Sequence, residues 1–121
     1  MDRIRFVECQ GKRILYLDFS DLSPRDVEAV VGRARELVGA QPPLSLLTLT
    51  NVTNLRFDDA AVRAVKELAE HNRPFVRAAA LVGVTGLKKI VLNTVKLFSK
   101  RDFALFDDVE SAKSWLASQG D

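Results

Sequence analysis

Apolar, β-rich runs alternate with amphipathic helical segments along this chain, and no other sequence feature constrains the fold as strongly. The runs LSLLTLTNV (44–52) and VRAAALVGV (76–84) are apolar on both sides, as expected of strands buried on both faces of a sheet. Each run is followed by apolar residues at helical spacing. Strands that alternate with helices predict a mostly parallel sheet with crossover helices.

The predicted element order is β-β-α-β-α-β-α-β-α, within one domain that spans residues 1–121. Gln10 and Gly11 predict a hairpin turn, so the first strand should lie antiparallel to the second, which is apolar on both faces and lies inside the sheet. Ser23 and Pro24 predict a helix start, as do Asp58 or Asp59 and Asp108. The strands are expected at 3–9, 12–20, 44–52, 76–84 and 103–106, and the third helix at 86–100. The sequence therefore predicts an α/β fold with four helices and a mostly parallel five-stranded sheet that has an antiparallel edge strand.

Composition excludes several classes of protein. The net charge of +2 is too small to indicate nucleic-acid binding, and no apolar run approaches the roughly 20 residues of a membrane span. The N-terminal stretch carries charges throughout and lacks the apolar core of a secretory signal. Cys9 has no second cysteine to pair with, so a cytoplasmic protein is expected. Cys9 and the lone His71 fall short of a metal site, and no cofactor is predicted.

The stretch LVGVTGLKK (81–89) resembles a phosphate-binding loop, but its spacing does not fit one. A Walker loop needs GxxxxGK[ST], whereas two residues separate Gly83 from Gly86 here. A dinucleotide fingerprint needs GxGxxG after the first strand, and this GxxG follows a late one. Thr85 is predicted to cap the next helix, whose free amides favour an anion. A solvated strand-to-helix turn is the alternative.

The third predicted helix is basic. Residues 86–101 contain five basic side chains and no acidic one. The apolar positions predicted to face inward are Leu87, Ile90, Val91, Thr94, Val95 and Phe98. On the outer face, Leu92 is expected among Lys88, Lys89 and Lys96. This face suits an acidic protein partner or an anionic membrane surface, without stable insertion. Alternatively, Leu92 is one exposed leucine of no special meaning.

No catalytic set is visible, so the protein is not expected to be an enzyme. Asp58 and Asp59 could bind Mg²⁺, but adjacent carboxylates at a helix start are more often caps. The chain lacks the strand-end acidic cluster of a receiver domain, a Gly-x-Ser-x-Gly elbow and a Ser/His/Asp set. An enzyme would have to depend on Cys9 and His71, which have no third group beside them in the sequence.

Four phrases carry a family resemblance over nearly the whole chain. They are ILYLDFSDL, LSLLTLTNVTNLRFDD, HNRPFVRAAALVGVTGLKKIV and FALFDDVESAKSWL. Together they resemble the STAS family, and more closely the bacterial SpoIIAA-like proteins. In the anti-sigma factor antagonists of that family, a phosphorylatable serine stands in a DSSG-like motif at a helix start. That motif falls near Arg56 to Asp59, with Phe57 and Asp58 where the serines would be.

The resemblance implies a non-catalytic regulatory or protein-interaction module in signalling that lacks the usual switch serine. Its surface would combine the basic helix with the helix starts and the loops before them, at Thr53, Asp58, Thr85 and Gly86. Neither threonine is marked as a phosphorylation substrate. The alternative is a small-molecule or lipid-binding domain, with its ligand near the helix N-termini. The alanine-rich run 76–84 permits such a pocket, and edge strand 3–9 permits a homodimer.

Overall fold

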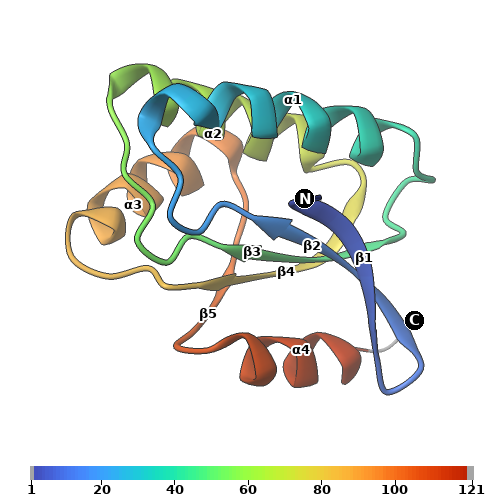
Figure 1. The fold of residues 1–121 in the computed structure, drawn as a ribbon. Helices are drawn as coiled ribbons and strands as arrows, with labels where there is room; N and C mark the ends of the chain where they lie inside the picture. Colours follow the sequence, from blue (N-terminus) through green and yellow to red (C-terminus); the bar gives the residue numbers. More distant parts are fainter. Residues whose placement is uncertain (1, 120–121) are drawn as a thin grey trace.

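The protein, described here by a computed structural model over residues 2–119, is a five-stranded sheet with helices on both faces (Figure 1). The strands lie in chain order and are β1 (Ile4–Cys9), β2 (Lys12–Asp18), β3 (Leu46–Asn51), β4 (Val76–Val82) and β5 (Ala104–Phe106). The helices are α1 (Pro24–Gly39), α2 (Asp59–Asn72), α3 (Leu87–Ser99) and α4 (Val109–Ala117). Element order and element types agree with the sequence prediction.

The N-terminal hairpin sets the antiparallel edge of the sheet. Gln10 and Gly11 both have positive φ, as a two-residue type I′ turn requires, and Cys9 pairs with Lys12. All other strand pairs are parallel. β2 therefore lies between β1 and β3, where both of its faces are covered.

Helices α1, α2 and α3 cover one face of the sheet, and α4 alone covers the other (Figure 1). Asp58 begins α2, and its Oδ1 accepts a hydrogen bond of 2.8 Å from the Ala61 backbone N–H. Asp108 begins α4 in the same way, through a 2.7 Å bond from Ser111. The hydrogen bonds that Ser111 donates from its backbone N–H and its hydroxyl lower the pKa of Asp108. Asp58, rather than Asp59, is thus the α2 cap.

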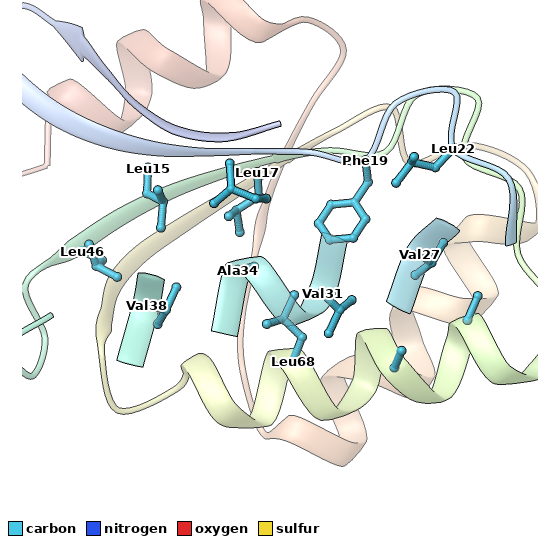
Figure 2. Close-up of a cluster of buried hydrophobic side chains, with 13 residues drawn as sticks. Leu15, Leu17, Phe19, Leu22, Val27, Val31, Ala34, Val38, Leu46 and Leu68 are labelled. Carbon is cyan, nitrogen blue, oxygen red and sulfur yellow. The ribbon is translucent and has the colours of Figure 1, made fainter. Parts of the chain in front are cut away.

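Two apolar clusters hold the layers together. The larger lies between the sheet and helices α1 and α2, where the Phe19 ring packs close to Val27 and Val31 (Figure 2). The smaller joins β2, β3 and β4 to α4 through Leu49, Ala112 and Leu116, among others. Helix α3 contributes no residue to either cluster. It is therefore the helix least anchored in the apolar core.

Helix α3 corrects two sequence predictions. Gly86, with φ +58°, is its N-cap, so Thr85 precedes the helix and does not cap it. The helix is also turned from its predicted orientation, because Leu87, Ile90, Thr94 and Phe98 are exposed and not inward. The side chains that face the protein are those of Lys88, Val91, Leu92, Val95 and Ser99. Leu92, predicted to lie on the outer face, therefore lies on the inner one.

The observed orientation of α3 is testable by a pair of substitutions. Val95→Ala should lower the free energy of unfolding by about 2 kcal/mol, because Val95 is buried. Leu97→Ala should change it by less than about 0.5 kcal/mol, because Leu97 is 82% exposed. Urea denaturation of the two variants measures both values. If Leu97→Ala lost more stability than Val95→Ala, then Leu97, and not Val95, would face the protein.

Candidate functional site

An apolar cavity of about 110 Å³ lies beneath α3, between that helix, α2 and the face of the sheet. The sheet contributes Leu17, Thr48 and Leu81, and Phe19 follows β2 into the same space. The two helices close it with Val65, Leu68, Val91, Leu92 and Val95, among others. A dry cavity of about 150 Å³ lined by such residues can hold benzene. This cavity is therefore large enough for a smaller apolar group.

Three polar residues line the part of the cavity that lies away from the start of α3. Asn72 ends α2 just before β4 and Arg101 precedes β5, so both lie near the amino ends of strands, while Thr48 lies within β3. The Asn72 and Thr48 side chains are each only 3% exposed. Buried polar groups usually have hydrogen-bond partners in the protein. A group without one is therefore a candidate for binding a ligand.

Arg101 is the most unusual of these groups. One guanidinium nitrogen donates a 3.1 Å hydrogen bond to the Ala69 carbonyl, and the guanidinium carbon lies 4.7 Å from the Phe103 ring centroid. Burial lowers the pKa of Arg101 to about 10, so the group stays charged at neutral pH. Within residues 2–119, no carboxylate lies within 4.0 Å of it.

Lys88 lies at the opposite, carboxyl-terminal part of the cavity. Its Nζ donates a 3.1 Å hydrogen bond to the backbone carbonyl of Val52, which follows β3. The side chain is half-buried, so it tethers the first turn of α3 to the sheet. The predicted basic face requires Lys88 to project into solvent beside Lys89. The structure contradicts that prediction for Lys88.

Most of the remaining predicted surface residues lie near the carboxyl ends of the strands, whereas Lys96 lies in the last turn of α3. Thr53, Thr85 and Gly86 are exposed, and Thr53 is held by hydrogen bonds from its N–H and hydroxyl to Asn51 Oδ1. Lys89 is exposed, whereas Lys96 is half-buried. The structure thus divides the predicted surface: Lys88 and Leu92 belong to the cavity, and the other residues do not line it.

The segment that the resemblance aligns with a switch motif, Arg56 to Asp59, contributes to the cavity. Phe57 is half-buried and lines it, whereas Asp58 is engaged as the α2 cap. An apolar ring and a capping carboxylate therefore stand at this helix start, and Ala60 follows Asp59.

The two residues that an enzyme would need are not brought together. Cys9 packs against the cluster on the α4 face of the sheet. His71 lies on α2, which covers the opposite face, and its ring centroid is 5.7 Å from that of Phe75. Over residues 2–119, no three His, Cys, Asp or Glu side chains gather closely enough to hold a metal ion.

Sequence reasoning missed the three polar cavity residues. Thr48 carried a signal, since it is a polar residue within an apolar strand. Nothing in the sequence marks Asn72, and Arg101 is one of the five basic residues of the segment 86–101. Their common location depends on how α2 and the segment before β5 meet, which no local pattern encodes.

The comparisons with known proteins agree with the architecture. No family profile and no curated protein matches the chain. A crystal structure of an uncharacterised DUF3478-family protein from Shewanella loihica, described as having a SpoIIAA-like fold, superposes with a TM-score of 0.71. The superposition covers 93% of this chain and 91% of that one, at 18% sequence identity.

This chain has the SpoIIAA-like fold. The likeness confirms the resemblance as far as the fold is concerned, since identity of 18% carries no information about activity. Within the described part of this SpoIIAA-like domain, no helix is both long enough and apolar enough to cross a membrane.

Proposed function

We propose that this SpoIIAA-like domain is a non-catalytic binding module that holds a small apolar ligand in the cavity beneath α3. The cavity itself is the observation that carries the proposal. Its lining is mostly apolar, so water inside it finds few hydrogen-bond partners. A ligand whose apolar atoms replace that water gains about 25 cal/mol for each Å² of apolar surface that it buries.

The covering helix supports the same proposal. α3 lies over the cavity with Val91, Leu92 and Val95 turned inward, yet it adds no residue to the two core clusters. An element with few core contacts opens at lower free energy than the strands beneath it. Such an element can move to widen the entrance of the partly open cavity for a ligand.

Filling the cavity tests the proposal. Ala69 is buried on α2 and lines the cavity, so Ala69→Leu should leave the free energy of unfolding unchanged or raise it by about 0.5–2 kcal/mol. Ala34 is also buried, in the packed core outside the cavity, so Ala34→Leu should lower the free energy of unfolding by about 1–3 kcal/mol. Thermal and urea denaturation of both variants measure the difference. Equal destabilisation would indicate that the space is already packed.

Ligand occupancy is measured by native mass spectrometry of the protein purified from several hosts. The parent protein should carry an adduct that disappears on denaturation, and Ala69→Leu should carry less of it. Protein that is reproducibly free of adduct in every host would contradict the proposal.

A protein partner is the second candidate, favoured by the outer face of α3. Leu87, Ile90 and Leu97 are 71%, 64% and 82% exposed, and Lys89 and Lys100 are exposed on the same helix or at its end. Apolar side chains beside lysines suit an acidic protein surface. Affinity capture by the parent protein, by Ile90→Glu/Leu97→Glu and by Ala69→Leu tests this candidate. It requires that the first variant alone lose the partner.

Other elements of the functional hypothesis remain predictions. A role in bacterial cytoplasmic signalling without a switch serine depends on the resemblance to the anti-sigma factor antagonists alone. Homodimerisation through the exposed edge of β1 also remains a prediction. Gel filtration with light scattering measures the oligomeric state.

A further inference from the structure

The partly buried guanidinium of Arg101 has no carboxylate partner among residues 2–119. The guanidinium contacts one backbone carbonyl, at Ala69, and the ring of Phe103. A charge withdrawn from water is normally paired, because its desolvation is costly. Arg101 lines an apolar cavity and meets no carboxylate within the described residues. An anion inside the cavity would supply the missing charge.

Asn72 and Thr48 leave hydrogen-bonding capacity unused in the same cavity. Asn72 Oδ1 lies 2.9 Å from His71 Nδ1, but no residue between 2 and 119 pairs with the Nδ2 of the same amide. The Thr48 hydroxyl likewise has no hydrogen-bond partner in that range. Both side chains are almost completely buried and line the cavity. No fully buried side-chain nitrogen or oxygen in the described residues lacks a partner, so these two unpaired atoms each reach open space, and both residues line the cavity. A ligand there can accept a hydrogen bond from each of them.

We propose that the cavity binds a small apolar monocarboxylate, with its head group held by Arg101 and Asn72 and its tail extending toward Lys88. This proposal rests on the proposed function and names its ligand class. Thr48, midway along the sheet, adds a third donor. The tail contacts Leu68, Val91 and Val95, which lie along the helices that close the cavity.

A carboxylate fits these donors better than other small groups do. Arginine presents a planar fork of N–H groups that matches a carboxylate geometrically. Arg101 is the only cation at this part of the cavity among the described lining residues, so it matches one negative charge and not the higher charge of a phosphate. Benzene places six carbons in about 150 Å³, so the volume of about 110 Å³ holds about four or five non-hydrogen atoms, and the end of a longer tail lies in the open mouth of the cavity.

The test compares pentanoate with 1-pentanol by two-dimensional amide NMR titration at neutral pH. The two probes have similar tails, but only pentanoate carries charge. An apolar cavity without an available cation would reject the anion, so pentanoate should bind about tenfold more tightly than 1-pentanol here. If 1-pentanol binds and pentanoate does not, the ligand class is wrong but the cavity still binds. If neither probe binds, the proposed function fails as well.

Substitutions assign the head-group site. Arg101→Met should weaken pentanoate binding at least tenfold, because the carboxylate loses a charged hydrogen bond. The same substitution should change 1-pentanol binding less than threefold. Lys89→Met removes the same charge from an exposed position and should leave both affinities within about twofold. Thr48→Val and Asn72→Ala provide the test if Arg101→Met does not fold, and each should weaken pentanoate binding several-fold. Unchanged pentanoate affinity in the folded variants would overturn the proposal.

Discussion

Gly83→Ala is expected to lower the free energy of unfolding by about 3 kcal/mol or more. Gly83 has φ +87°, where a side chain costs roughly 1–2 kcal/mol. An added Cβ would also lie 2.7 Å from the Cα and N atoms of Thr53, and closer still to its hydroxyl. Backbone atoms cannot move aside as a flexible side chain can, so the clash adds a penalty like that of overpacking, about 1–3 kcal/mol. Urea denaturation measures the sum.

Gly32 provides a matched control of opposite sign. It lies on the exposed side of α1, and a Cβ there would meet no atom within 4 Å. Gly32→Ala should therefore raise the free energy of unfolding by about 0.5–1 kcal/mol, through helix propensity alone. A small effect of Gly83→Ala, comparable in size to that control, would show that β4 and the loop after β3 do not approach as closely as described.

Phe19→Ala is expected to lower the free energy of unfolding by about 3–5 kcal/mol. Phe19 is the largest fully buried side chain of the chain's described part, and its ring lies between the sheet and the helices (Figure 2). Truncation removes the apolar burial of a whole ring and leaves a void that neighbours fill incompletely. Because Phe19 also lines the cavity, the void should merge with it and admit a larger apolar ligand.

Phe98→Ala makes the same chemical change at a different depth. Phe98 is 45% exposed on α3, where the Lys66 ammonium lies 4.9 Å from its ring centroid. Its truncation should lower the free energy of unfolding by less than about 1.5 kcal/mol. If the two phenylalanine variants lost similar stability, α3 would have to be packed with Phe98 inward, as the sequence pattern alone predicted.

The sequence predicted the architecture well because local and global signals agree there. Gln10 and Gly11 have the conformational freedom that a tight hairpin needs, and the apolar runs at 44–52 and 76–84 match β3 and β4. Asp58 and Asp108 are confirmed as caps by their hydrogen bonds. Each of these features depends on residues close together in the chain.

The orientation of α3 could not be predicted because its sequence carries apolar residues on two faces. Leu87, Ile90, Thr94 and Phe98 form one helical stripe, while Val91, Leu92 and Val95 extend a second one. Periodicity alone does not show which of two such stripes faces the sheet. Long-range contacts decide it: Lys88 bonds to Val52, and Val95 and Ser99 are buried.

The position of the cavity could not be predicted from the sequence. The alternative of a ligand-binding domain stated only that the alanine-rich run 76–84 permits a pocket. That alternative placed the ligand near the helix N-termini at the carboxyl ends of the strands. The cavity reaches that region at Phe57 and Lys88, but it extends along the sheet to Asn72 and Arg101. Its polar groups come from separate elements, so only the assembled layers bring them to one space.

The most direct measurement is of nuclear Overhauser effects between bound 1-pentanol and the methyl groups of the protein. A ligand in the cavity should give cross-peaks to Leu68, Val91 and Val95, which line it, and none to Leu87, Ile90 or Leu97, which are exposed. The same cross-peaks should disappear in Ala69→Leu. Cross-peaks confined to the exposed leucines and isoleucine, or persisting in Ala69→Leu, would contradict a binding site beneath α3.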